Sequence, residues 1–308
     1  MINNIVQTQN LTKKFSDSYS VDNLSLNIGS KEIYGFLGPN GAGKSTTMKM
    51  LLGLMQPTKG NIKIFNQDIS KNRDEILMHV GALIEEPSYY KNLTGLENLQ
   101  VIQRLLNLPS KNVKEALKIV RLTEHKDKLV KNYSLGMKQR LGIALAIVKF
   151  PKLLILDEPT NGLDPSGIQE IRELIKSFPK TYGMTVLISS HLLSEIEHMA
   201  NTVGIINRGK LLFEGKLTEL EEQNKILINT NNNRKCINLL QSKGYKLENN
   251  EKPLLLDTTQ KDISTAVKLL VNNQFEIYQV QSVQKSLEEK FIEITNDGKE
   301  YLLSLIHI

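Results

Sequence analysis

The sequence of 308 residues predicts an α/β protein with two domains, a mostly parallel sheet domain over residues 1–222 and a small α+β domain over residues 223–308. Two observations lead to this prediction. Over the first domain, short β-rich runs alternate with helical patterns, as a mostly parallel sheet requires. After the polar stretch 219–224 the composition changes, and shorter, more regular elements follow.

The strands expected in the first domain are short runs rich in β-branched and aromatic residues. They are Ile5–Thr12, Leu24–Ile28, Ile33–Leu37, Gly60–Ile64, Val80–Ile84, Leu153–Leu156, Thr185–Ser189 and Thr202–Ile206. Strand signals are missing over residues 93–133, where Thr94–Leu106 and Ser110–Leu122 have helical patterns. We therefore expect an all-helical insertion there, and a closing hairpin whose turn is Asn207–Lys210.

The second domain shows a regular succession of short elements. In order, they are the strand Ile226–Asn229, the helix Arg234–Lys243, the strands Tyr245–Leu247 and Pro253–Asp257, the helix Ile263–Asn272, the strand Phe275–Val280 and the helix Leu287–Ile294. This βαββαβ order predicts a ferredoxin-like domain with one added helix. The apolar segment 301–308 falls outside the pattern.

Composition restricts the kinds of protein that the chain can be. A single cysteine, Cys236, excludes an internal disulfide framework and favours a reducing compartment. No secretory signal is visible at the start, and no run approaches the roughly 18 apolar residues that span a bilayer, so we expect any action at a membrane to need another chain. The net charge of +6 fits a solvated lysine-rich surface, or contacts with anionic ligands or the anionic cytoplasmic leaflet.

Residues 38–45 read Gly-Pro-Asn-Gly-Ala-Gly-Lys-Ser, the G-x-x-x-x-G-K-S pattern of a phosphate-binding loop between a strand and a helix. Glycines let backbone N–H groups point at an anion, and the helix N-terminus adds partial positive charge. We expect Lys44 to reach the β- and γ-phosphates of a nucleoside triphosphate and Ser45 to bind Mg²⁺. The nucleotide-binding residues expected here are Gly38, Pro39, Asn40, Gly41, Ala42, Gly43, Lys44, Ser45 and Thr46.

A pair of carboxylates, Asp157 and Glu158, follows the apolar run 153–156. The run predicts a buried strand, and ligands of open α/β sheets bind at the carboxyl ends of such strands. Asp157 is therefore expected in the Mg²⁺ shell, and Glu158 is expected to be the general base that deprotonates the attacking water.

The segment 133–140, Tyr-Ser-Leu-Gly-Met-Lys-Gln-Arg, precedes the carboxylate strand and resembles the signature of the ATP-binding-cassette family. That signature is usually written L-S-G-G-Q, and the chain departs from it at Leu135 and Met137. The resemblance implies a P-loop cassette ATPase. It also implies a homodimer with two ATP molecules between the subunits, in which Ser134 and Gly136 contact the γ-phosphate held by the opposite subunit.

Further residues match the same family. Residues 161–164, Asn-Gly-Leu-Asp, resemble its D-loop, which joins the two sites and places Asp164 near the nucleotide. His191 follows the apolar strand 186–190 and resembles the switch histidine, which contacts the γ-phosphate. Phe15 stands where the family carries an aromatic that stacks on adenine, with Tyr19 as the competing candidate.

Glu85 stands where the family usually has a glutamine that senses Mg²⁺ and anchors the loop facing the membrane subunit. A carboxylate can still bind the metal, but unlike an amide it cannot donate a hydrogen bond. A glutamate here resembles the cassette subunits of lantibiotic self-immunity transporters and related peptide-antibiotic exporters. The resemblance therefore implies an ATPase subunit on the cytoplasmic face of the cell membrane that drives export through separate permease subunits.

Two alternatives remain open from the sequence. One is a cassette ATPase for an exporter of another drug or of a lipid. The other is a soluble cassette ATPase acting on ribosomes or DNA, but such translation factors usually carry two cassettes, whereas this chain has one phosphate loop and one signature. The second domain also lacks the paired aromatic residues of an RNA-recognition sheet, so we expect the protein to have no nucleic-acid partner.

Overall fold

The computed structural model describes residues 4–85, 87–220, 225–248, 253–255, 260–283 and 287–295. They form two compact units. The first contains the described residues up to Leu217 together with those from Glu293 onward, and the second spans Thr218–Ile292. The sequence predicts a boundary at residue 222 and a second domain that includes everything beyond it. The structure instead begins the second unit at Thr218 and returns the chain to the first unit at Glu293.

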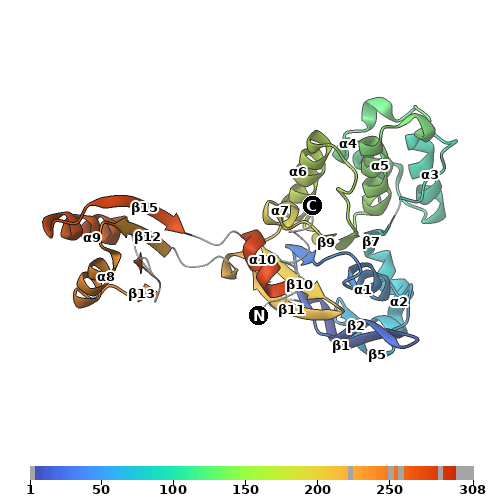
Figure 1. The fold of residues 1–308 in the computed structure, drawn as a ribbon. Helices are drawn as coiled ribbons and strands as arrows, with labels where there is room; N and C mark the ends of the chain where they lie inside the picture. Colours follow the sequence, from blue (N-terminus) through green and yellow to red (C-terminus); the bar gives the residue numbers. More distant parts are fainter. Residues whose placement is uncertain are drawn as a thin grey trace. The chain divides into compact units, whose positions relative to one another are not determined.

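The first unit contains the mostly parallel sheet that the sequence predicts. Its strands are β4 (Ile33–Leu37), β7 (Val80–Leu83), β8 (Leu153–Leu156), β9 (Thr185–Ser190), β10 (Thr202–Asn207) and β11 (Lys210–Lys216), in the order β11-β10-β4-β9-β8-β7 (Figure 1). Neighbouring strands are parallel except β10 and β11, which form the predicted hairpin. β4, β8 and β9 are buried along their whole length, as expected for parallel strands covered on both faces.

A second sheet of the first unit is antiparallel and was not predicted. Its strands are β1 (Asn4–Phe15), β2 (Ser18–Leu24), β3 (Asn27–Gly29), β5 (Lys59–Ile64) and β6 (Gln67–Asp68), in the order β2-β1-β5-β6 with β3 also on β1. The strand predicted at Leu24–Ile28 is divided between β2 and β3. Strand composition indicates a strand but does not say which strand it pairs with, so a separate sheet could not be recognised from the pattern.

Helices surround the parallel sheet and form the predicted insertion. They are α1 (Lys44–Leu51), α2 (Ile69–Met78), α3 (Gly95–Leu105), α4 (Ser110–Ile119), α5 (Leu135–Ile147), α6 (Pro165–Tyr182) and α7 (Leu193–Glu197), with single 3₁₀ turns η1 (Thr123–His125), η2 (Val130–Asn132) and η3 (Leu217–Glu219). α3 and α4 confirm the helical insertion, and both pack against α5 (Figure 1). Within the described residues, no helix combines the length and apolar character needed to cross a membrane.

The second unit has its own sheet and core. Its elements are β12 (Lys225–Thr230), α8 (Asn233–Ser242), β13 (Leu247–Glu248), β14 (Leu254–Leu255), α9 (Gln260–Asn272) and β15 (Ile277–Val283), followed by α10 (Leu287–Thr295), which ends in the first unit. The strands lie in the order β13-β14-β12-β15, and each neighbouring pair is antiparallel. The element order is the predicted one, while the ferredoxin-like assignment stays a prediction. The segment 301–308 lies outside the described residues.

Gly204 of β10 lies between two strands that are joined by a buried tyrosine. The hydroxyl of Tyr34, on β4, donates to Glu214 Oε1 on β11 over 2.8 Å, and β10 separates these two strands. Burial, together with the negative charge and hydrogen bond of Glu214, raises the pKa of Tyr34 well above its usual value. A Cβ atom at Gly204 would lie 2.3 Å from the Tyr34 hydroxyl, so the side chain of Tyr34 can reach Glu214 only because residue 204 is glycine.

We expect Gly204→Ala to lower the free energy of unfolding by about 1–3 kcal/mol, because overpacking forces the tyrosine or the strand to move. Urea denaturation measures the change. In the double variant with Tyr34→Phe, which lacks the nearest clashing atom, the combined loss should be smaller than the sum of the two single losses. Strictly additive losses would show that the two residues do not meet in this way.

Candidate active site

The predicted phosphate loop forms the turn between β4 and α1. Its shape depends on glycine at residues 41 and 43, which have φ angles of 79° and 110°. A Cβ atom at Gly43 would lie 2.4 Å from the carbonyl oxygen of Ser20, so the loop also packs too closely there for a side chain. α1 begins at Lys44, so Ser45 and Thr46 lie in its first turn, where the helix end attracts anions. The structure therefore places all the predicted residues of this motif, 38–46, in one turn at a helix N-terminus, and their binding of a nucleotide stays a prediction.

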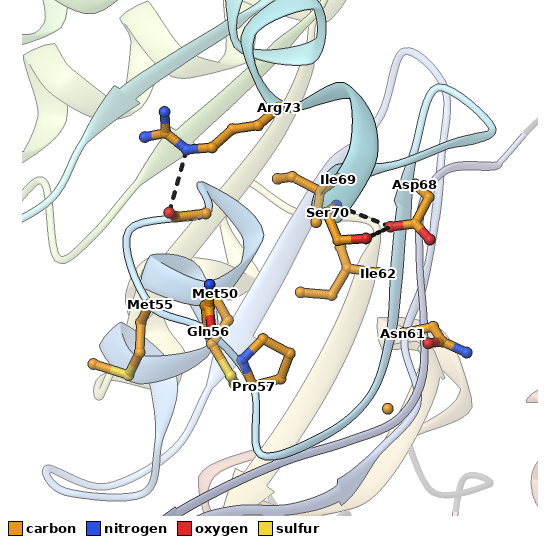
Figure 2. A pocket seen from close by; sticks show the side chains of 12 residues that line it. Met50, Met55, Gln56, Pro57, Asn61, Ile62, Asp68, Ile69, Ser70 and Arg73 are labelled. Carbon is orange, nitrogen blue, oxygen red and sulfur yellow. Dashed lines mark hydrogen bonds between the residues drawn. The ribbon is translucent and has the colours of Figure 1, made fainter.

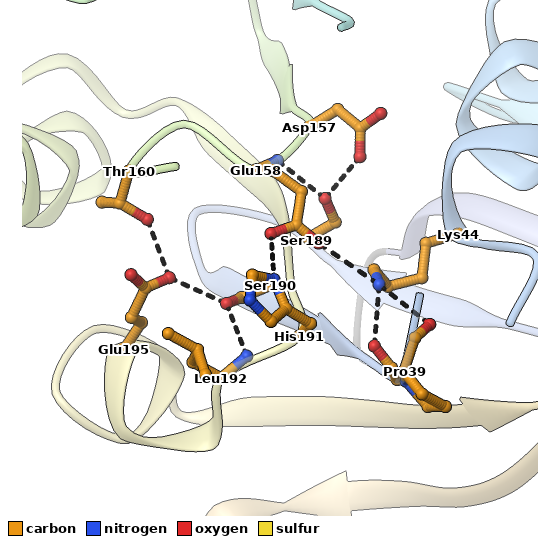
Figure 3. A network of polar contacts seen from close by, with 11 residues as sticks. Pro39, Lys44, Asp157, Glu158, Thr160, Ser189, Ser190, His191, Leu192 and Glu195 are labelled. Atoms are coloured by element: carbon orange, nitrogen blue, oxygen red, sulfur yellow. Dashed lines mark hydrogen bonds and ion pairs between the residues drawn. The ribbon is translucent and has the colours of Figure 1, made fainter. Parts of the chain in front are cut away.

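The side chain of Lys44 joins this loop to the predicted catalytic carboxylate (Figure 3). It is 5% exposed, and its Nζ atom donates to the carbonyl oxygens of Gly38 at 2.7 Å and Pro39 at 3.3 Å. The same nitrogen lies 3.2 Å from Glu158 Oε1. The ammonium group is thus held at the mouth of the loop by two carbonyls and one carboxylate.

Asp157 and Glu158 follow β8 directly, and a serine of the neighbouring strand holds both. Ser189 Oγ donates to Asp157 Oδ1 at 2.6 Å and accepts a hydrogen bond from the backbone nitrogen of Glu158 at 2.9 Å. Ser189 was not among the predicted site residues, although Ser189 and Ser190 are the polar residues that end an apolar run at the same sheet edge. The serine fixes the direction in which both carboxylates leave the strand.

His191 and Glu158, the two residues predicted to be catalytic, are in direct contact. His191 Nδ1 lies 2.7 Å from Glu158 Oε2, while the other carboxylate oxygen faces Lys44. Glu158 has a φ angle of 47°, a left-handed backbone conformation that is uncommon for residues other than glycine. The local turn after β8 therefore presents this carboxylate between a lysine and a histidine (Figure 3).

Glu85 follows β7 and forms an ion pair with a lysine of the phosphate-loop helix. Its Oε1 atom lies 2.5 Å from Lys49 Nζ. Lys49 is four residues after Ser45 on α1 and so lies on the same helix face, one turn further along. The predicted metal ligands Glu85 and Ser45 are thus brought to the same side of α1, and Lys49 is a neighbour that the sequence analysis did not identify.

The chain just beyond Glu85 packs tightly against α5. A Cβ atom on Gly142, in the middle of α5, would lie 2.7 Å from Pro87 Cβ and 3.1 Å from Leu83 Cδ1. The helix that starts with the signature residues therefore lies directly against the segment that follows β7.

Ser134 and Asp164 both cap helices within the chain. Ser134 Oγ accepts from the backbone nitrogen of Met137 at 3.3 Å at the start of α5, and Asp164 Oδ1 accepts from Gly167 at 3.1 Å at the start of α6. A Cβ atom on Gly136 would lie 3.9 Å from Leu163, so the signature and the D-loop segment are adjacent. Their contact with a second subunit stays a prediction.

Phe15 and Tyr19 are both open to solvent, with 45% and 54% of each residue exposed. The Nζ atoms of Lys13 and Lys14 lie 5.2 Å and 5.5 Å from their respective ring centroids. Both rings are therefore available for stacking on a base, and the choice of Phe15 over Tyr19 stays a prediction.

A separate pocket of about 370 Å³ lies away from these residues, between the end of α1, β5 and the start of α2 (Figure 2). Polar groups along it bond to each other: Arg73 Nε donates to the Gly53 carbonyl at 3.2 Å, and Asp68 Oδ1 accepts from Ser70. The pocket contains none of the predicted site residues. We assign it no part in the chemistry described here.

A phosphate loop, a carboxylate pair and a histidine gathered at the carboxyl edge of a mostly parallel sheet define a nucleoside triphosphatase. Residues 21–161 match the family model described as "ABC transporter". The chain is 42% identical over 300 residues to the bacitracin transport ATP-binding protein BcrA of Bacillus licheniformis, which covers 96% of this chain and 98% of that protein. The chain therefore belongs to the ATP-binding-cassette transporter family, and it is an ATPase.

A second relative and a solved structure support the same family assignment. The chain is 48% identical over 210 residues to the lantibiotic transport ATP-binding protein SrtF of Streptococcus pyogenes, which covers 68% of this chain and 90% of that protein. Among solved structures, the dimeric post-hydrolysis state of the ATP-binding cassette MJ0796 bound to ADP and Pi is 26% identical, with a TM-score of 0.62, covering 68% of this chain and 98% of that one. The structural likeness covers the fold of the first unit rather than the whole chain.

We expect Lys44→Ala to weaken ATP binding about 10-fold or more, because losing a charged hydrogen-bond partner costs roughly 1.5–3 kcal/mol. Titration with a fluorescent ATP analogue measures the affinity. Lys210→Ala is the matched control, because Lys210 is 66% exposed and its pairing with Asp22 at 3.5 Å contributes little. Equal affinities of the Lys44→Ala variant and the parent protein would contradict the assignment of the loop.

Proposed function

We propose that this chain is the ATP-hydrolysing subunit of an exporter that removes a peptide antibiotic from the cell, giving resistance or self-immunity. The observation that carries the proposal is the similarity to the bacitracin transport protein along nearly the whole chain, including the second unit. The similarity to the lantibiotic transport protein supports the same substrate class but covers a smaller share of the chain. The transported molecule is expected to bind separate membrane subunits, and the residues that recognise it are expected to belong to those subunits.

The phosphate loop is proposed to hold ATP together with Mg²⁺. Mg²⁺ prefers oxygen ligands and usually keeps only one or two carboxylates besides phosphate oxygens and water, which suits the Ser45 hydroxyl, Asp157 and Glu85. Among the described residues there is no cluster of three or more histidine, cysteine, aspartate or glutamate side chains of the kind that cages a metal. The metal would neutralise charge on the phosphates, while Lys44 binds them directly and Phe15 stacks on the base.

Hydrolysis is proposed to begin when the γ-phosphate displaces Glu158 from Lys44. In the structure one oxygen of Glu158 is 3.2 Å from Lys44 Nζ, and the other is 2.7 Å from His191 Nδ1. When the lysine turns to the phosphate, Oε1 becomes available to orient and deprotonate a water molecule, while His191 keeps hold of Oε2 and contacts the γ-phosphate. The geometry of the carboxylate therefore supports its role as general base.

Two copies of the chain are proposed to close around two ATP molecules, with Ser134, Gly136 and Asp164 of one copy reaching the nucleotide of the other. ATP-binding-cassette ATPases act as dimers with membrane permease subunits. We place this dimer on the cytoplasmic face of the membrane, where the segment from Glu85 to Pro87 would face the permease. Because Pro87 packs on α5, closing of the dimer at the start of α5 is expected to move it.

Glu158→Gln is expected to accumulate an ATP-bound dimer, because the amide cannot take the proton from water while the nucleotide contacts remain. Size-exclusion chromatography with light scattering, in the presence of ATP and Mg²⁺, measures the mass. Glu173→Gln is the matched control, because Glu173 is exposed on α6 and lies 3.7 Å from Arg121. A variant that stays monomeric at saturating ATP would argue against the proposed mechanism.

Cells that carry the native transporter with Lys44→Ala in this chain are expected to become more sensitive to a peptide antibiotic. Growth inhibition is measured with bacitracin, a set of lantibiotics and drugs of unrelated structure, against cells with the intact chain. Increased sensitivity only to an unrelated drug would favour an exporter of another drug. Unchanged sensitivity across the whole panel would contradict the proposed substrate class, while the ATPase assignment would still hold.

A further inference from the structure

Glu195, on the short helix α7, is a buried carboxylate with one partner in the loop after β8 and the other at the end of β9. It is 7% exposed, and its Oε2 atom accepts hydrogen bonds from Thr160 Oγ1 at 2.7 Å and Ser190 Oγ at 2.8 Å. Thr160 and Ser190 are themselves 3% and 1% exposed. Figure 3 shows the three side chains meeting beside the contact between Glu158 and His191.

The position of these hydroxyl groups along the chain links them to the two predicted catalytic residues. Thr160 lies two residues after Glu158, and Ser190 immediately precedes His191. Ser190 Oγ also accepts a hydrogen bond from the backbone nitrogen of Leu192 at 3.0 Å, so the loop is fixed on both sides of the histidine. One carboxylate oxygen therefore joins the segment that carries Glu158 to the segment that carries His191.

The helix that carries Glu195 is held closely on the parallel sheet. A Cβ atom on Gly35, in β4, would lie 2.3 Å from Ile196 Cγ2, so α7 packs directly onto the strand that leads into the phosphate loop. Hydrogen bonds to an ionised carboxylate are shorter and about twice as strong as bonds between neutral groups. The Glu195 carboxylate, on a helix held in this way, is suited to keeping the loop after β8 and the end of β9 in one arrangement.

We propose that Glu195 is a positioning residue for ATP hydrolysis, which sets the distance between His191 and Glu158 through Thr160 and Ser190. This inference rests on the roles proposed above for Glu158 and His191. Displacement of a catalytic group by about 1 Å can lower the rate roughly 100-fold, so loss of one of these hydrogen bonds should affect turnover more than nucleotide binding.

The test compares two substitutions at Thr160 in the full-length protein, with steady-state ATP hydrolysis as the readout. Thr160→Val has nearly the same shape but no hydroxyl donor, and it should lower kcat roughly 10- to 100-fold with little change in KM. Thr160→Ser keeps the donor and should restore hydrolysis. Ser190→Ala, which removes the other donor, should lower kcat in the same direction.

A matched control separates positioning from general loss of stability. Thr185 is 1% exposed at the opposite end of β9, and its hydroxyl accepts a hydrogen bond from the Lys31 backbone nitrogen at 2.7 Å. Thr185→Val also removes a buried hydroxyl, so it should lower the melting temperature without lowering kcat. In the Glu158→Gln background, Thr160→Val should still form the ATP-bound dimer.

The outcomes distinguish this inference from the proposed function. Parental kcat in Thr160→Val, equal losses in Thr160→Val and Thr160→Ser, or loss of the trapped dimer would each overturn the positioning role of Glu195. If Glu158→Gln itself hydrolyses ATP at the parental rate, the proposed mechanism fails together with the inference. If Glu158→Gln is inactive and Thr160→Val is normal, only the inference fails.

Discussion

β8 and β9 run in parallel register, with Leu156 opposite Ile188, so the two strands end side by side. Asp157, which directly follows β8, and Ser189, near the end of β9, are therefore within hydrogen-bonding distance without any further folding of the loops. β4 lies on the other side of β9 in the same parallel sense and delivers the phosphate loop to the same edge. Every contact among Lys44, Glu158 and His191 depends on this shared edge, because each residue comes from the end of a different strand.

The charged groups at this edge of the sheet are paired with one another. Glu158 lies between a lysine ammonium and a histidine ring, and Lys44 is also held by two loop carbonyls. An isolated charge at a 5% exposed position such as Lys44 would be costly, so the carboxylate partner stabilises the buried lysine. In the proposed mechanism, a triphosphate would replace Glu158 as the anionic partner of Lys44, so the lysine would stay paired.

Local patterns predicted which residues gather at this edge of the sheet, because strand, loop and helix follow each other directly in the phosphate loop and the predicted catalytic residues come soon after apolar strands. Contacts between distant segments could not be predicted in this way. Ser189, Lys49 and Glu195 reach partners 31 to 36 residues away in the chain, and a single serine, lysine or glutamate has no spacing that marks it. For the same reason, the sequence does not predict the antiparallel sheet of β1, β2 and β5, nor the return of the chain to the first unit at Glu293.

The close packing of Gly142 on Pro87 has a consequence for how the sequence can diverge. Because a Cβ atom at residue 142 would lie 2.7 Å from the proline ring carbon, any larger residue in the middle of α5 requires the chain after β7 to move away. Residues 87 and 142, which are 55 residues apart in the sequence, therefore cannot be substituted independently. A lineage in which residue 142 is no longer glycine must therefore also change the chain around Pro87.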